Sequence, residues 1–371
     1  MIERLQVRLN IGDLDLAVGE LVEVNRQYLF TYAPEFPSET LRLSPFKLSA
    51  NKNIVHQVSE SDRRVFQGIH GVFADSMPDG WGLLLIKRSV ESLGHSFADL
   101  TPLDILTYVG DRSLGSLRYT PVQVLEGSDA PTNLDLGKLG LESEKVFEGE
   151  ESKILASLFK LGGSPGGARP KVLAIVGKDG KSRKIKSDLG ALPDGFEHWI
   201  IKFRGKGDSV DDALAEFHYM QAAKNAGLNV PEADLFQADG KHFFGVKRFD
   251  VDSSDRRLHM HTLAGLLHAD FRTPALDYSA FLKATKLLTG SLADVKMGFR
   301  MAVFNVLFHN RDDHAKNFSY LMDQEGTWKL APAYDLTYST GPGGEHTTAI
   351  LGLGKNISDG KLLELASGAN I

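Results

Sequence analysis

The chain has 371 residues, 42% of them hydrophobic and 24% charged, which gives a globular protein enough apolar material for a core. It contains no cysteine, which excludes disulfides, thiolate metal sites and cysteine nucleophiles. The net charge of −6 lacks the basic surplus of proteins that grip nucleic acid alone, so we expect no direct nucleic-acid binding. With neither a secretory signal pattern nor a long apolar stretch, we expect a cytoplasmic protein without a membrane partner.

Residues 1–125 are expected to form a mixed α/β unit. Residues 4–10 alternate like a strand, and residues 83–93 and 103–109 have helical patterns. Residues 77–81 contain a Pro-Asp-Gly turn, which we interpret as structural and not as part of a site. Glycine, serine and aspartate then cluster before an acidic run, which predicts a solvated connector over residues 126–150.

Two further units are expected, over residues 151–250 and 251–371. The first has a glycine cluster at 161–171, strand patterns at 172–176, 198–203 and 243–249, and a helical pattern at 211–226. The second is mainly helical at first, with an apolar helix at 297–308 that we expect to be buried. A predicted hairpin, residues 318–330, follows a polar loop, residues 310–317.

The polar loop carries the first candidate site. Asp312 and Asn317 are five residues apart, the separation between the catalytic aspartate and the metal-binding asparagine of protein kinases. A hairpin follows and leads to Asp335, where kinases place a second metal-binding aspartate. Asp312 would accept the proton of a substrate hydroxyl, while Asn317 and Asp335 would supply the oxygen ligands that Mg²⁺ prefers.

Lys202 is a candidate partner of this loop because it interrupts an apolar strand, where an unpaired ammonium is costly. Glu216 lies 14 residues further on in a predicted helix, as in the strand-lysine and helix-glutamate pair of kinases. The alternative is an edge lysine whose head reaches solvent. Upstream, glycines in residues 164–171 would let backbone amides approach an anion, although they match neither phosphate-loop pattern and a plain turn is the alternative.

These stretches together resemble the HipA toxins of bacterial type II toxin–antitoxin modules along the whole chain. The resemblance is carried by residues 73–88, 104–117, 167–171, 199–202, 247–250, 312–319 and 332–335. It implies an α+β, protein-kinase-like bilobal fold with an added N-terminal subdomain, and ATP and Mg²⁺ as ligands. The units at 151–250 and 251–371 would then be the two kinase lobes, and Asp312, Lys202 and Glu216 the catalytic residues.

The resemblance also implies a nucleotide-binding set and a regulatory serine. The nucleotide-contacting positions are Gly166, Gly167, Ala168, Arg169, Pro170, Lys171, Lys202, Lys247, Arg248, Phe249, His314, Lys316, Asn317, Tyr334 and Asp335. Asn317 and Asp335 match the Mg²⁺ ligands, and Ser164 falls where a family member autophosphorylates itself, which expels the glycine loop. A phosphoserine adds about −1.5 to −2 charges, enough to move a loop away from ATP phosphates.

Some positions depart from the family's pattern. Arg169 and Pro170 stand where some members have glutamine and glutamate, and Asp313 replaces a glycine. Asp312 and Asp313 are therefore rivals for the role of base, and the separation from Asn317 favours Asp312. Family members continue with further helices, so we expect the second lobe to be truncated at residue 371.

Three functions are weighed. The first is a serine/threonine kinase toxin that phosphorylates a cellular protein, such as an aminoacyl-tRNA synthetase, and partners a small helix-turn-helix antitoxin through which it contacts DNA. The second is a catalytically silent binding module that acts as a co-repressor with that antitoxin. The third is a metal hydrolase built on His309, Asp312, Asp313 and His314, which leaves Lys202, Glu216 and Asp335 without roles. His259 and His261 could chelate a metal, but we expect them to be structural.

Overall fold

The computed structural model describes residues 2–371 except 124–131, 163–165, 179–183, 189, 191, 206, 210, 253 and 275. Its N-terminal part is built on a five-stranded antiparallel sheet of order β4-β3-β2-β1-β5. The strands are β1 (Arg4–Ile11), β2 (Leu14–Val24), β3 (Gln27–Tyr32), β4 (His56–Gln57) and β5 (Leu117–Thr120). β1 alternates because Leu5, Val7 and Leu9 face the core while their neighbours face outward.

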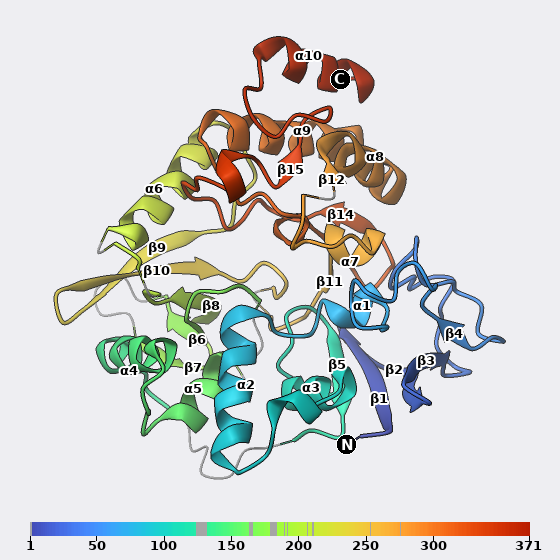
Figure 1. Ribbon diagram of the computed structural model, residues 1–371, viewed down its shortest axis with the longest axis vertical. Coiled ribbons are helices and arrows are strands. Elements are labelled where there is room, and N and C mark those ends of the chain that lie inside the picture. The colour runs from blue at the N-terminus through green and yellow to red at the C-terminus, as the bar shows by residue number, and fades with distance from the viewer. Residues whose placement is uncertain are drawn as a thin grey trace.

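A second five-stranded sheet, of order β7-β6-β8-β10-β9, lies beside α4 (Leu136–Glu148) and α5 (Leu155–Gly162) in Figure 1, and its strand β6 begins at Lys171, the last residue of the glycine loop. Its strands are β6 (Lys171–Gly177), β7 (Ile185–Ser187), β8 (Phe196–Lys202), β9 (Ala233–Ala238) and β10 (Lys241–Lys247). β6 is buried along its whole length, and it pairs with β8 in a register that sets Lys171 opposite Lys202. Two charged side chains are thus brought to the same end of the sheet.

Two small sheets complete the C-terminal part. The three-stranded sheet contains β11 (His259–Thr262), β13 (Ser319–Met322) and β14 (Trp328–Leu330), and β12 (Leu276–Asp277) pairs in parallel with β15 (Thr348–Ala349). β13 and β14 form the predicted hairpin, which therefore lies between the polar loop and Asp335.

The N-terminal half has the helices α1 (Gly71–Ala74), α2 (Gly80–Ser92), α3 (Pro102–Val109), α4 (Leu136–Glu148) and α5 (Leu155–Gly162). The C-terminal half has α6 (Asp212–Asn225), α7 (Leu263–Leu267), α8 (Tyr278–Thr289), α9 (Leu292–Leu307) and α10 (Asp359–Gly368). In Figure 1, α8, α9 and α10 lie at the top and α2, α3, α4 and α5 in the lower part, while α1 and α7 lie side by side between them. Within the described ranges, no helix is long and apolar enough to cross a membrane.

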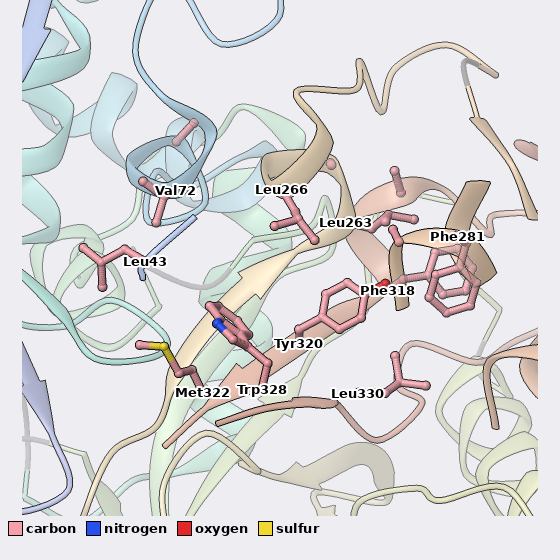
Figure 2. Close-up of a cluster of buried hydrophobic side chains, with 14 of the residues drawn as sticks. Leu43, Val72, Leu263, Leu266, Phe281, Phe318, Tyr320, Met322, Trp328 and Leu330 are labelled. Atoms are coloured by element: carbon pink, nitrogen blue, oxygen red, sulfur yellow. The ribbon is translucent and has the colours of Figure 1, made fainter. Parts of the chain in front are cut away.

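Two hydrophobic cores join segments that are far apart in the sequence. One core runs from the first sheet into the C-terminal helices, and Figure 2 shows Leu43 and Val72 beside Leu266, Tyr320 and Trp328. The other core joins α2, α4 and α5 to the second sheet. Both cores therefore cross the unit boundary predicted near residues 126–150.

Two sequence-based expectations are wrong in part. A solvated connector was expected over residues 126–150, but residues 136–148 form α4, capped by Asp135 and with Leu136, Leu139 and Val146 buried against α2 and the second sheet. The acidic run misled because apolar residues at helical spacing bury one face of α4 despite the charged residues between them, and even the Glu142 side chain is only 13% exposed. The helix predicted at 297–308 begins at Leu292 and is not buried all round, because Leu307 is 59% exposed.

Candidate active site

A cavity of about 170 Å³ lies between the second sheet, α6 and the polar loop. Its lining includes most of the predicted site residues: Gly166, Gly167, Lys171, Lys202, Glu216, Lys247, Arg248, Phe249, His314, Lys316, Asn317, Tyr334 and Asp335. Residues from three separate parts of the chain are thus brought to one space. Asp75, Met77 and Asp79 of the N-terminal part also line it.

Lys202 is the centre of the charge arrangement. It ends β8, and its ammonium lies 2.5 Å from Glu216 Oε1 and also contacts Asp335 Oδ1. Although burial favours the neutral amine, the carboxylates of Asp335 and Glu216 raise the pKa of Lys202, which stays charged. The sequence expectation that Lys202 pairs with a carboxylate of the next helix is thereby confirmed, and the solvent-facing alternative is wrong.

Glu216 and Asp335 respond differently to the same lysine. Burial raises the pKa of Glu216, with Lys202 opposing it, since the Glu216 side chain is only 3% exposed. Lys202 holds the pKa of Asp335 well below its ordinary range. Asp335 has a φ of 57°, a left-handed conformation that is unusual for a residue other than glycine and is often found at functional sites. Glu216 thus orients the lysine, while Asp335 remains an anion facing the cavity.

The polar loop presents its two neighbouring aspartates in opposite ways. The Asp312 side chain is 62% exposed and lies 3.9 Å from His314 Nε2, and partial burial raises its pKa. The Asp313 carboxylate is fully buried, where it accepts hydrogen bonds from the hydroxyl of Tyr278 and the backbone N–H of Thr347. Asp312 can therefore reach a substrate, whereas Asp313 anchors the loop.

Asn317 closes the loop. It ends the short 3₁₀ turn Ala315–Asn317, and its side-chain NH₂ donates to the carbonyl of Asp312 at 2.8 Å. Because that bond engages the amide nitrogen, the carbonyl oxygen is the atom left to ligate a cation. Tyr334 supports the same turn, since its hydroxyl donates to the carbonyl of Lys316 at 2.6 Å.

The glycine loop lies against the cavity, but its charged residues are engaged with the protein. The Arg169 guanidinium lies 3.1 Å from Asp212 and 3.9 Å from Glu216. The Lys171 ammonium contacts the Gly166 carbonyl, and burial followed by the nearby Lys202 lowers the pKa of Lys171 to about 8. Ser164 lies outside the described residues.

The last residue of β10 and the residues that follow it also line the cavity. The Lys247 ammonium lies 2.6 Å from Glu197, and Phe249 packs against the Tyr334 ring with the centroids 5.4 Å apart. Arg248 is held by Asp250 and Asp188, so its guanidinium shapes the wall through internal ion pairs.

Asp79 is a cavity residue that the sequence analysis missed, because the Pro-Asp-Gly turn was interpreted as structural. Its carboxylate accepts from the N–H of Gly167 and lies 2.9 Å from the Lys316 ammonium. The turn is also structural, since Trp81 donates to the carbonyl of Lys171. Nothing in the sequence near Asp79 signals the contact, which depends on long-range packing.

The competing metal sites gain no support from the structure. His259 donates from Nε2 to the carbonyl of Leu43, and His261 Nδ1 lies 2.6 Å from the Asp75 carboxylate. Both histidines are fully buried, which fits the structural role expected of them. In the part of the chain that the structure describes, no group of three His, Asp or Glu side chains could hold a metal. His309 contacts Arg311, and Asp313 is enclosed, which separates the set required by the hydrolase hypothesis.

A larger cavity, of about 390 Å³, is lined by Asp188, His198, Asp255, Arg248 and Arg257 on the other side of Arg248. Its carboxylates bond mainly to its own bases: Asp188 lies 2.8 Å from His198 Nδ1 and 3.2 Å from Arg248. Lys202, Asn317 and Asp335 line the smaller cavity and not this one, and Asp312 lines neither. The smaller cavity is therefore the candidate active site.

The smaller site fits a nucleotide with Mg²⁺. Mg²⁺ usually takes one or two protein carboxylates, with phosphate oxygens and waters filling its other positions. Asp335 offers an ionised carboxylate and Asn317 an amide oxygen, while Lys202, Lys171 and Lys316 bring positive charge to the same space. This donor set suits a small oxygen-ligated cation bound together with an anionic ligand.

Fold and site together define a protein-kinase-like chain: a strand lysine paired with a helix glutamate, and a catalytic-type loop followed by a hairpin and an aspartate. Residues 163–369 match the family model described as the HipA-like C-terminal domain, and residues 9–120 match the HipA N-terminal domain. The first match alone covers more than half of the chain, and the chain belongs to the HipA family.

Individual relatives are more distant. The chain is 32% identical to "Putative kinase Y4mE" of Sinorhizobium fredii over 134 residues, which are 33% of this chain and 31% of that protein. It is 31% identical to "Putative kinase Y4dM" of the same organism over 207 residues, which are 49% of this chain and 50% of that protein. The matches thus span at most half the length of these two relatives.

A solved structure confirms the fold. The chain is similar to a chain of the Shewanella oneidensis MR-1 complex of the toxin–antitoxin system proteins HipA and HipB with operator DNA. The TM-score is 0.68 at 20% identity, and the match covers 99% of this chain and 85% of that one. The expected kinase-like α+β fold with an added N-terminal part is therefore confirmed.

Proposed function

We propose that this chain is an ATP- and Mg²⁺-dependent serine/threonine protein kinase. The observation that carries the proposal is the convergence of Lys202, Glu216 and Asp335 on one cavity, with the Asp312 loop at its edge. Family membership and the kinase names of two relatives support the same activity.

The chemistry follows from where the side chains lie. Asp312 is exposed and carries a raised pKa, which suits a carboxylate that takes the proton of a substrate hydroxyl. That hydroxyl oxygen forms a bond to the γ-phosphorus of ATP as the bond from this phosphorus to the β–γ bridging oxygen breaks, and ADP leaves. Lys202 stays charged and can hold ATP phosphates, while Glu216 fixes its direction.

Asn317 and Asp335 would hold the metal ion. Mg²⁺ bound there would neutralise the charge that develops on the phosphates. The chain's own contribution is to keep both ligands in place: Asn317 through its bond to the Asp312 carbonyl, and Asp335 through its contact with Lys202.

Radiolabelled ATP with Mg²⁺ tests the activity. Wild-type protein should label itself or a protein of a bacterial lysate, and Asp312→Asn should not. Equal labelling of the two would overturn the assignment and would favour a silent binding module. Phosphopeptide mapping of the labelled chain should find phosphate on Ser164, because the family resemblance places the regulatory serine there.

The biological role is proposed on the same basis. A related chain is solved with HipB and operator DNA, which supports a small helix-turn-helix antitoxin as the partner and DNA contact through that partner. The net charge of −6 agrees with indirect DNA contact. The substrate would be a cellular protein such as an aminoacyl-tRNA synthetase. Copurification with the product of an adjacent reading frame tests the partner, and phosphoproteomics after induction tests the substrate.

A further inference from the structure

Asp79 precedes the first residue of α2, but its side chain does not cap that helix. It occupies the N-cap position, where an aspartate side chain usually accepts from the first free N–H groups of its own helix. The structure shows no such bond for Asp79. Its carboxylate instead reaches Gly167 of the glycine loop and Lys316 of the polar loop.

The turn also holds the glycine loop by its backbone. The N–H of Trp81 donates to the carbonyl of Gly167 at 3.1 Å, and the Trp81 indole donates to the carbonyl of Lys171 at 3.1 Å. Gly80 lies so close that an added Cβ would come within 2.5 Å of Ala168 Cα. The segment 79–81 therefore binds the glycine loop at two places, at Gly167 and at Lys171.

Lys316 connects the Asp79 turn to the polar loop that carries Asp312 and Asn317. It lies next to Asn317, its backbone carbonyl accepts from Tyr334, and its ammonium lies 4.4 Å from the Phe271 ring centroid. Burial would raise the pKa of Asp79, but Lys316 and the N–H of Gly167 lower it below its ordinary value. The bridge is therefore an ionised carboxylate between two donors that face one cavity.

We propose that Asp79 is a positioning residue that fixes the glycine loop and Lys316 in one register, so that both face the phosphates of the same nucleotide. The proposal rests on the proposed kinase function. In this proposal the N-terminal part of the chain contributes to the nucleotide site, since the turn that carries Asp79 belongs to that part.

The test compares Asp79→Asn with a matched control, Asp62→Asn. Asp62 lies in the same N-terminal part, its side chain is 20% exposed against 22% for Asp79, and its lysine partner is 2.8 Å away against 2.9 Å. It does not line the cavity. A change seen only in Asp79→Asn is therefore due to the location of Asp79 at the cavity, and not to the general loss of a half-buried ion pair.

Two measurements are made on the full chain. Hydrogen exchange should speed up at the amides of residues 166–169 and 171 in Asp79→Asn, while residues 172–177 of β6 stay as in wild type. The Kd of a fluorescent ATP analogue should rise about tenfold, as expected for the loss of one charged contact. In kinase assays the KM for ATP should rise more than kcat falls. Asp62→Asn should change none of these.

A double-mutant cycle guards against indirect effects. If Asp79 acts through Lys316, the loss of nucleotide affinity caused by Asp79→Asn should shrink in a Lys316→Gln background, and Asp79→Glu should restore part of it. Unchanged loop exchange in Asp79→Asn overturns the proposal, as does an equal effect of Asp62→Asn. A wild-type chain that binds no nucleotide contradicts the kinase function, and the exchange data still decide whether Asp79 holds the loop.

Discussion

Asp312 and Asp313 are adjacent in the chain, yet the Asp312 side chain is 62% exposed and that of Asp313 is fully buried. Spacing from Asn317 favoured Asp312 as the base but left Asp313 as a rival. The structure separates the two residues: the Asp313 carboxylate accepts hydrogen bonds within the protein, from Tyr278, His346, Thr347 and Thr348, whereas that of Asp312 is open to solvent.

Substituting each aspartate by asparagine should separate catalysis from stability. Asp312→Asn should lower phosphoryl transfer by about 10²- to 10⁴-fold with little change in melting temperature. Asp313→Asn should lower the free energy of unfolding by about 2–4 kcal/mol, because its NH₂ group would face donors. Urea unfolding and ATP turnover of both variants check this. A stable, inactive Asp313→Asn beside an active Asp312→Asn would reverse the assignment.

The pair of Lys202 and Glu216 should be essential to nucleotide use. Lys202→Met removes the ammonium and leaves two carboxylates, Glu216 and Asp335, facing each other, so kcat/KM for ATP should fall at least about 100-fold. Glu216→Gln should cost less, because it keeps a hydrogen-bond acceptor for the lysine. Steady-state kinetics measure both.

The control for this pair is Lys241→Met. Lys241 is a lysine of the same sheet whose side chain is 40% exposed and lies 3.6 Å from Glu144, and its loss should leave kcat/KM unchanged. If Lys241→Met and Lys202→Met behave alike, the special role of Lys202 is wrong.

Local patterns predicted those parts of the site whose residues are close together in the sequence as well as in space. The Asp312-to-Asn317 loop, the hairpin and Asp335 follow one another, so their kinase-like spacing could be recognised from the sequence. Lys202 and Glu216 could be recognised for a related reason, since a lone lysine in an apolar strand requires a partner and the next helix carries a carboxylate.

Contacts between remote segments could not be predicted in this way. Asp79 is 88 residues from Gly167 and 237 from Lys316, and no local pattern encodes either contact. The helix α4 was hidden for another reason: its second half lies in the acidic run, while Leu136, Leu139 and Val146 at helical spacing settle which face is buried. The engagement of Arg248 by Asp188, 60 residues away, likewise required the fold.

Asp335 should carry the metal dependence of nucleotide binding. Lys202 keeps the pKa of Asp335 well below its ordinary range, so the Asp335 carboxylate is ionised throughout the neutral range and can ligate Mg²⁺. In wild type, Mg²⁺ should tighten binding of an ATP analogue measured by isothermal titration calorimetry. Asp335→Asn should lose most of that gain and keep the metal-free affinity within a few fold. The same Mg²⁺ effect in both proteins would exclude Asp335 as a ligand.

Three buried histidines should make the fold sensitive to mild acid. Burial lowers the pKa of His70 to about 3 and those of His259 and His268 to about 4. In the unfolded chain their pKa is about 6.5, so below that pH the unfolded state binds more protons than the folded state. Stability is therefore fully present above about pH 6.5 and is lost as the pH falls toward 4.

His259→Gln tests this because the glutamine amide can still donate to the Leu43 carbonyl that His259 contacts. Each such histidine changes the free energy of unfolding by at most about 1.4 kcal/mol per pH unit in this window. Between pH 6.5 and 5 the wild-type free energy of unfolding should drop, and His259→Gln should drop by about 1 kcal/mol less per pH unit. His95→Gln, at an exposed position, should behave like wild type. Identical slopes for His259→Gln and wild type would show that His259 is not a source of the acid sensitivity.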